Sequence, residues 1–506
     1  MAAGIMSGCS WEGELNVLLI YPEFPDTFWS FKHALRFVRK RASLPPLGLL
    51  TVAAMLPEGW GRRLVDLNVQ NLTQADLTWA DIAFVSAMAV QRSSATAAIA
   101  RCKAAGLTVV AGGPLFLNET DQYSDVDHFV LNEAELTLPA FLVDLQSGRA
   151  ERVYSTKKFA DIRQTPAPAW ELADLKRYAT MAVQFSRGCP YNCDFCNVTV
   201  MLGHRPRLKT AEQIVTELDR LYQLGWRESV FFVDDNLIGN KRVLKESLLP
   251  ALIKWRKGKM GMTFNTEASI NLADDEQLMS LMAEAGFDMV FIGIETPSEE
   301  GLEECGKKHN RHRDLIADVK RIQRHGLQVQ GGFIIGFDTD TPSIFQRQIE
   351  FIQKSGIVTA MVGLLQAPMG TRLYQRMAQE GRILGVFSGD NVDGMTNIIP
   401  RMNLEVLHKG YQAVVQTIYA PANYYARVRT FLREYKAPKI MVPIDLEHIL
   451  ALLRSILRLG IIGKERVEYW KLFFWTLFRR PRLFPLAITF SIYGYHFRQV
   501  VDLHIG

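Results

Sequence analysis

Residues 186–196 read SRGCPYNCDFC and contain three of the six cysteines of the chain. These residues follow the apolar run MAVQFS (181–186), so the sequence predicts that the thiols lie on a loop at the carboxyl end of a strand. Thiolates are soft ligands that suit an iron–sulfur cluster or a zinc ion. Either site commonly takes four ligands, and the stretch supplies three: Cys189, Cys193 and Cys196.

A zinc site is the simplest alternative for the missing ligand. His204 follows Cys196 by eight residues and would complete a Cys3His set. The other cysteines, Cys9, Cys102 and Cys305, are scattered singly, which is typical of a chain in the reducing cytoplasm. The net charge of +5, from 58 basic and 53 acidic residues, gives no reason to expect a nucleic acid partner.

Residues 176–400 alternate short apolar runs with amphipathic helical patterns such as AEQIVTELDRLYQLG. Six of these runs resemble strands: MAVQFS, SVFFVDD, MTFNTEASI, MVFIGIET, VQGGFIIGF and TAMVGLL. Six β/α units are too few for a closed eightfold barrel. We therefore predict a partial (β/α)6 barrel whose site lies at the carboxyl ends of the strands.

An α/β domain is predicted ahead of the barrel, over residues 14–150, with a Pro-rich linker at 151–175. Its strand-like runs are NVLLIYP, RRLVDLNV, IAFVSAM, TVVAGGP and HFVLNEAE. Alternation of such runs with helices predicts a flavodoxin-like (Rossmann-like) sandwich that binds its ligand beyond the carboxyl ends of the strands.

Residues 401–506 lack strand signals and predict an α-helical C-terminal domain. Its last apolar run, LFPLAITFSIYGYHF (483–497), is shorter than the roughly 20 residues that cross a bilayer. We favour packing of its aromatic helices on the protein itself. The alternative is an interfacial segment, WKLFFWTLFRRPRLF, that draws a lipid substrate from a membrane surface.

The cysteine spacing, with Phe195 before Cys196, resembles the signature of radical S-adenosylmethionine (SAM) enzymes. In that family the amino and carboxylate groups of SAM bind the fourth iron of a [4Fe-4S] cluster. The resemblance implies that Cys189, Cys193 and Cys196 are both metal ligands and catalytic residues. It also implies one-electron reduction of SAM to methionine and a 5'-deoxyadenosyl radical.

Further motifs resemble the family at later strand ends: VDDN (233–236), GIETP (293–297), GGFIIGF (331–337) and QAPMGT (366–371). The resemblance implies that Asp234, Asp235 and Asn236 contact the SAM amino group. The alternative for these three residues is a strand end that caps a helix.

Two later motifs carry further expected cofactor contacts. Glu295 is expected to bind ribose hydroxyls or a cationic group, with helix capping as the alternative. Gly332 and Gly336 are expected near adenine, and an ordinary tight turn is their alternative.

The front domain resembles the cobalamin-binding domain of the B12-dependent branch. Small residues at its strand ends, Ser86, Gly112 and Gly113, would let a flat corrin approach the backbone. A scaffold without ligand is the alternative. The sequence has no Asp-x-His-x-x-Gly motif, so we name no axial cobalt ligand.

Taken with the tail, nearly the whole chain resembles B12-binding-domain radical SAM enzymes with a helical C-terminal domain of unknown function, related to hopanoid C-2 methylase-type proteins. This implies methylation of an unactivated carbon in a small-molecule substrate, such as a lipid or isoprenoid. The alternatives are oxidation, rearrangement or cyclisation with the same cofactors, and a noncatalytic cobalamin or cluster sensor.

The resemblance also implies a protein reductant such as flavodoxin or ferredoxin. We expect a cytoplasmic protein. If its substrate is a lipid, we expect the C-terminal helices to contact the inner face of the membrane peripherally.

Overall fold

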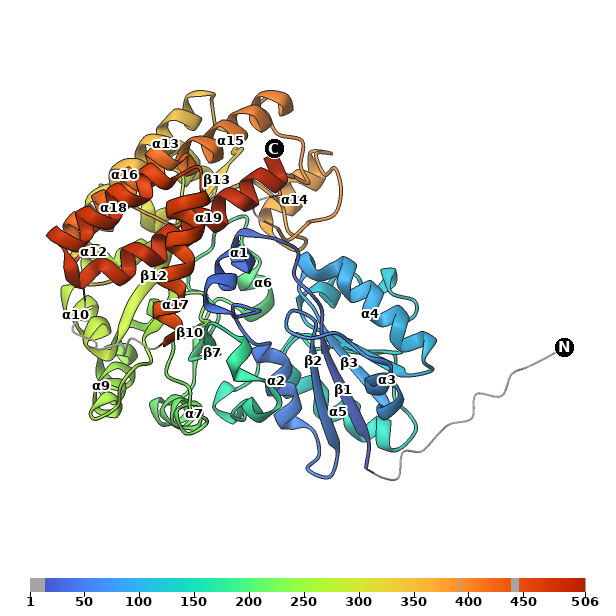
Figure 1. Cartoon of the computed structure of the whole chain (residues 1–506). Coiled ribbons are helices and arrows are strands. Elements are labelled where there is room, and N and C mark those ends of the chain that lie inside the picture. The colour runs from blue at the N-terminus through green and yellow to red at the C-terminus, as the bar shows by residue number, and fades with distance from the viewer. Residues whose placement is uncertain (1–13, 391–392, 438–445, 506) are drawn as a thin grey trace. The chain divides into compact units, whose positions relative to one another are not determined.

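The computed structural model describes residues 14–390, 393–437 and 446–505 (Figure 1). Contacts divide the chain into two compact units. One unit joins Met1–Pro25 with Pro45–Leu175, and the other joins Asp26–Leu44 with Lys176–Gly506. The barrel and the C-terminal helices therefore belong to the same unit.

The first unit contains a six-stranded parallel sheet in the order β2-β1-β3-β4-β5-β6. Its strands are β1 (Asn16–Tyr21), β2 (Gly61–Asp66), β3 (Ile82–Ser86), β4 (Thr108–Gly112), β5 (His128–Val130) and β6 (Val153–Tyr154). The five predicted runs each contain a strand, and their order is that of flavodoxin-like folds. The sixth strand was not predicted: it lies within the predicted linker and is only two residues long.

Helices cover both faces of this sheet. They are α2 (Leu47–Met55), α3 (Gln74–Trp79), α4 (Arg92–Ala104) and α5 (Ala134–Gln146). Side chains alternate along β3, so Ala83 and Val85 join a core with α3 and α4, whereas Phe84 meets Phe141 of α5 from the other face. This double coverage explains why the strands are continuous apolar runs.

The second unit contains a six-stranded parallel sheet in the order β14-β13-β12-β11-β10-β7. Each strand pairs with its neighbour in this series, which is the arrangement of the predicted partial barrel. Its strands are β7 (Met181–Val183), β10 (Val230–Phe232), β11 (Phe264–Glu267), β12 (Phe287–Glu295), β13 (Gln328–Ile335) and β14 (Ala360–Leu364). The prediction of six β/α units is confirmed.

Connecting helices follow the strands, and a short antiparallel pair, β8 (Ser186–Arg187) and β9 (Arg207–Leu208), flanks the cysteine loop. The helices are α6 (Val198–Leu202), α7 (Ala211–Gln223), α8 (Lys241–Val243), α9 (Leu249–Arg256), α10 (Glu276–Ala285), α11 (Glu299–Glu304), α12 (Leu315–Arg324), α13 (Ser343–Ser355) and α14 (Arg372–Gln379).

The tail forms long helices that pack on one another and on α13 (Figure 1). They are α15 (Leu404–Tyr419), α16 (Pro421–Glu434), α17 (Leu446–Ser455), continued by a π-helix at Ile456–Ile462, α18 (Arg466–Arg479) and α19 (Phe484–Ile505). The predicted all-helical tail is confirmed. Within the described residues, none of the helices has both the length and the apolar character that a membrane span requires.

Residues Asp26–Leu44, which contain the short helix α1 (Lys32–Leu35), leave the first sheet and pack in the second unit. Phe28 stacks on Phe497 of α19 with a centroid distance of 4.2 Å, and the Arg41 amide donates to the Arg177 carbonyl at 2.8 Å. The predicted first domain, 14–150, included this segment, because no local signal in the sequence marks its partners in the second unit.

Candidate functional site

The cysteine loop leaves β7 at the carboxyl edge of the barrel sheet and is held by its own backbone. Gly188 has a φ of 96°, and a Cβ there would lie 2.8 Å from the Gly203 carbonyl oxygen. The Cys189 amide donates to that same carbonyl at 3.2 Å, and the Cys196 amide donates to the Cys193 carbonyl at 3.2 Å. Glycine at 188 is therefore required by a close approach of two backbone segments.

Two later segments clamp the other side of the loop. The Asp194 amide donates to the Cys305 carbonyl at 3.0 Å, and the Asp194 carbonyl accepts from the Leu373 amide at 2.9 Å. Arg372 donates to the Asn192 carbonyl and to the Asp194 carboxylate. The QAPMGT motif ends at Thr371, which caps α14 and so positions this arginine.

The three thiols lie close enough to influence one another, and burial is the main cause of their altered acidity. Burial raises the pKa of Cys193 to about 11 and that of Cys196 to about 12, and it also raises the pKa of Cys189. Neighbouring cysteine charges add to the rise at Cys193 and Cys196. The thiolates therefore need a bound cation, so metal binding here must release protons.

The geometry gives no support to a zinc ion at this loop. His204 is exposed. Across the part of the chain that the structure describes, no three His, Cys, Asp or Glu side chains gather round a position that could hold one metal ion. Cysteines that bind different corners of a four-iron cube do not have to converge on one ion, so their donor set suits such a cluster.

Three polar residues of the VDDN motif follow β10, but they differ in their surroundings. Asp234 is fully buried, and its carboxylate accepts from the backbone amides of Phe185 (3.0 Å) and Ser186. It thus ties the end of β10 to the segment that leads into the cysteine loop. Burial raises the pKa of Asp234 to about 7.

The next two residues lie nearer the cysteines. Burial raises the pKa of Asp235 to about 6. Asn236 is buried, accepts from the Ser269 amide at 3.2 Å and also contacts the Cys189 thiol. Asn236 makes no capping hydrogen bond to the following turn, so helix capping is wrong for it, as it is for Asp234. Contact of these residues with SAM stays a prediction.

Glu295 ends β12 at a bulge in its pairing with β13 and has a φ of 64°. Its carboxylate forms a buried ion pair with Lys307, and its contact with a cofactor stays a prediction. Helix capping is wrong for Glu295, because Ser298 caps α11. A Cβ on Gly293 would lie 2.5 Å from the Lys307 ammonium, which explains the glycine of the GIETP motif.

The two glycines expected near adenine are each explained by contacts within the chain. A Cβ on Gly332 would lie 2.8 Å from the Phe291 ring. Gly336 has a φ of 108°, and its amide donates to the Asp340 carboxylate at 2.9 Å. Their contact with adenine stays a prediction.

In the first unit, the predicted cobalamin residues meet at the carboxyl ends of β3 and β4, where Ser86 pairs with Gly112. Gly113 has a φ of 91°, and a Cβ there would lie 2.8 Å from Ser86 Oγ. A Cβ on Gly112 would lie 2.8 Å from the Val130 carbonyl. These strand ends are free of bulky side chains, which fits a wide, flat ligand, although packing within the chain already requires both glycines.

Sequence reasoning missed several residues at the barrel site. Lys307 and Cys305 lie beside Cys193, and the loop's Tyr191 stacks on His309 with a centroid distance of 3.8 Å. Glu267 ends β11, and burial raises its pKa to about 8. Glu267 could have been predicted as a site residue from the sequence, because it stands at the end of a barrel strand. Lys307, Cys305 and His309 follow a helix, and only tertiary contacts reveal them.

Two parts of the chain match known protein families. Residues 183–352 match the radical SAM superfamily, and residues 371–505 match a domain of unknown function (DUF4070). An uncharacterized methyltransferase of Synechocystis is 41% identical, over 97% of this chain and 94% of the relative. Hopanoid C-2 methylase of Rhodopseudomonas palustris is 34% identical, over 90% of this chain and 88% of the relative.

Among solved structures, the radical SAM methyltransferase TsrM from Kitasatospora setae, with cobalamin and a [4Fe-4S] cluster bound, has a similar fold. The TM-score is 0.61 at 14% identity, and the match covers 97% of this chain and all of that one. At this identity the likeness concerns the fold alone. The match spans both the flavodoxin-like unit and the open barrel.

Proposed function

Because this chain belongs to the radical SAM superfamily, in the family that includes hopanoid C-2 methylase, we propose that it is a cobalamin-dependent radical SAM enzyme that methylates an unactivated carbon. The observation that carries the proposal is the loop of Cys189, Cys193 and Cys196, which is held in place by the second unit's own backbone and lies beside Asp235 and Lys307.

Three cysteine thiolates would hold a [4Fe-4S] cluster and leave its fourth iron to SAM. When bound, the reduced cluster and SAM supply a 5'-deoxyadenosyl radical, and cobalamin supplies the methyl group. The chain's own part is to keep the loop rigid through Asp194 and Arg372, and to surround the reacting groups with buried side chains that exclude water.

Lys307 and Asp235 suit the two charged ends of SAM. Lys307 is a buried cation close to Cys193, where it would attract a carboxylate, and Asp235 is a partly buried carboxyl group close to Cys196, where it would accept from an ammonium. Asn236 adds an amide beside Cys189.

Cobalamin is proposed for the first unit on the strength of the family and of the fold, with Ser86, Gly112 and Gly113 at the strand ends. We assign no axial cobalt ligand; His128 Nδ1 lies 2.7 Å from the Glu151 carbonyl oxygen. His33 lies in the second unit, 3.5 Å from the Asp26 carboxylate.

The test is anaerobic purification followed by reconstitution with iron and sulfide. We expect about four irons and one cobalamin per chain and conversion of SAM to 5'-deoxyadenosine. S-adenosylhomocysteine should accumulate as well when the acceptor is present. Its absence with the right acceptor would favour oxidation, rearrangement or cyclisation instead. A protein that binds neither iron nor SAM would contradict the proposal.

We further propose that the acceptor is a lipid or isoprenoid and that flavodoxin or ferredoxin supplies the electron. The protein would act in the cytoplasm, at the inner face of the membrane. An exposed apolar face supports this: Leu453, Leu457 and Ile461 are each at least 55% exposed, and Phe478 on α18 is 78% exposed.

Exposed basic residues lie in α18 or directly beside it along the chain: Lys464, Arg466, Lys471, Arg479 and Arg482. The other face of α18 is buried at Tyr469, Leu472 and Thr476. Packing on the protein therefore accounts for the apolar residues on that face but not for those on the exposed face. Exposed aromatic and aliphatic side chains among arginines and lysines are the composition of a surface that binds anionic lipids.

A further inference from the structure

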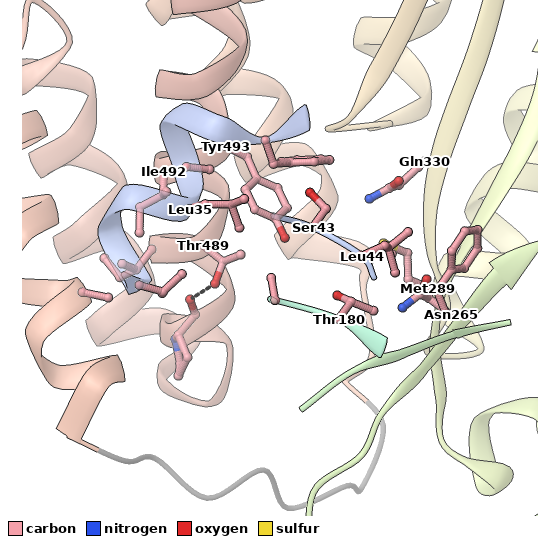
Figure 2. A pocket seen from close by; sticks show the side chains of 18 of the residues that line it. Leu35, Ser43, Leu44, Thr180, Asn265, Met289, Gln330, Thr489, Ile492 and Tyr493 are labelled. Carbon is pink, nitrogen blue, oxygen red and sulfur yellow. Dashed lines mark hydrogen bonds between the residues drawn. The ribbon is translucent and has the colours of Figure 1, made fainter. Parts of the chain in front are cut away.

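The second unit contains a cavity of about 510 Å³ that the cysteine site does not use (Figure 2). Three parts of the chain line it: the middle of the barrel strands, the segment Asp26–Leu44, and helices α17 and α19. Figure 2 shows Leu35, Ser43 and Leu44 from the segment and Thr489, Ile492 and Tyr493 from α19 around the same space. Pockets of about 300–1,000 Å³ hold ligands of drug size.

Most of its wall is apolar. The helical side presents Leu452, Phe484, Ile488 and Ile492, and Phe31 packs on Tyr493 of α19 with a centroid distance of 5.0 Å. The barrel side presents Met289 and Phe291, together with Trp29. Trp29 packs on Phe291 with a centroid distance of 5.2 Å, so the segment's aromatic ring is anchored to β12. Such a wall favours a hydrocarbon body over a nucleotide or sugar.

One end of the cavity is polar, and its groups come from one layer of the barrel. In the register of the strands, Glu267 of β11 and Gln330 of β13 both pair with Phe291 of β12. Gln330 is only 5% exposed, and Figure 2 shows its amide directed toward the cavity. Nothing in residues 14–390, 393–437 or 446–505 hydrogen-bonds the side chain of Gln330 or of Glu267. A buried amide without a partner is costly, so a ligand group at this end would satisfy it.

This polar end faces the proposed cofactor site. Asp235 and Lys307 are both near enough to alter the pKa of Glu267, in opposite directions. Glu267 is the last residue of β11 and lines the cavity, so it lies at the carboxyl edge of the sheet from which the cysteine loop also leaves. A ligand that reaches Glu267 presents its nearest carbons to that edge. The opposite end opens past α17, because His448 and Ile449 line the cavity and are exposed.

We propose that this cavity binds the hydrocarbon body of a polycyclic or isoprenoid molecule, with one hydroxyl or similar polar group of the ligand hydrogen-bonded to Gln330 and Glu267. The identification of this ligand with the methyl acceptor rests on the proposed function. The binding site itself does not.

The test uses the full-length reconstituted protein under anaerobic conditions without SAM, and retinol, a fluorescent isoprenoid alcohol, as the probe. We expect saturable binding at one site, with energy transfer from Trp29. Thr489→Trp should fill the cavity and weaken retinol binding at least tenfold. Leu503→Trp on the same helix, at an exposed position away from the cavity, should bind retinol like wild type.

Gln330→Leu should weaken retinol binding about fivefold, as expected for one hydrogen bond. Circular dichroism and the thermal unfolding midpoint establish that each variant is folded. Unchanged binding by a folded Thr489→Trp protein overturns the inference.

Wild-type SAM cleavage separates the two proposals. A protein that cleaves SAM but does not bind retinol saturably removes the cavity proposal alone. A protein that binds retinol in this cavity but assembles no four-iron cluster removes the proposed function alone.

Discussion

Glu295 and Lys307 form a buried ion pair at the carboxyl end of β12, beside the thiol of Cys193. Burial alone would lower the pKa of Lys307, but the charges of Glu295 and Cys193 outweigh it and raise the pKa above its ordinary value. The pair lies over Gly293, where a side chain would collide with it. A cation is thus fixed next to a proposed cluster ligand, Cys193, by a glutamate in a left-handed backbone conformation.

Replacing Lys307 tests the cost of separating this pair. Lys307→Met leaves the Glu295 carboxylate buried without its partner and should destabilise the protein by about 3–5 kcal/mol. Adding Glu295→Gln should recover part of the loss. Urea unfolding followed by circular dichroism measures both. Lys409→Met, which breaks an exposed pair with Glu405, serves as control and should change little. Additive effects of the two changes would argue against the pair.

Cys193→Ala should abolish SAM cleavage and cluster assembly while cobalamin stays bound, since cobalamin is assigned to the other unit. Iron content, cobalamin content and 5'-deoxyadenosine formation are the measurements. Cys305→Ala is a close control, because Cys305 is buried nearby and its backbone carbonyl, which the substitution keeps, accepts from the Asp194 amide of the loop. Retained cleavage in the Cys193 variant would remove the cluster assignment.

Stability should fall as the pH rises from about 4 to 7, in part because of Asp234. Its folded pKa is about 7 against 3.8 for the ordinary group, so over this range the folded state holds a proton that the unfolded state has lost. The folded state is therefore favoured at lower pH, by at most about 1.4 kcal/mol per pH unit for one proton. Calorimetric midpoints at several pH values should show a shallower slope for Asp234→Asn; an identical slope would contradict the assignment.

Two glycines in the first unit allow two effects on the free energy of unfolding to be measured separately: the clash of an added Cβ and the strain of a positive φ. Gly113 and Gly106 both have positive φ, but a Cβ meets Ser86 Oγ at 2.8 Å only at Gly113, and nothing lies within 4 Å at Gly106. Gly113→Ala should therefore be more destabilising than Gly106→Ala by about 1–3 kcal/mol. Thermal unfolding and the amount of cobalamin retained would be compared. Equal effects would show that the strand end relaxes freely.

The exposed apolar face should bind membranes. The wild-type protein should sediment with vesicles that contain phosphatidylglycerol, and high salt should weaken the binding. Leu457→Asp combined with Phe478→Asp should reduce binding about tenfold. Met260→Asp, at another exposed apolar position, should have little effect. Equal vesicle binding by the wild-type protein, the double variant and the Met260 variant would show that the exposed apolar face does not bind membranes.

Local pattern was sufficient for the six barrel strands and the five main strands of the first sheet. Buried parallel strands are continuous apolar runs, and amphipathic helices separate them, so each element is encoded by a short stretch. The cysteine motif could also be found from the sequence, because its three proposed ligands come from one loop. The two-residue strand β6 has too few residues to leave such a pattern.

By itself, the sequence determined the order of the elements, the family and the cluster loop, because each depends on residues that are neighbours along the chain. Only the tertiary structure placed Lys307 against Glu295, made Asp234 an acceptor for the Phe185 amide, and packed Trp29 on Phe291 in the cavity wall. These relationships join segments far apart along the chain. Burial and the packing of many side chains decide them, and no local periodicity records either.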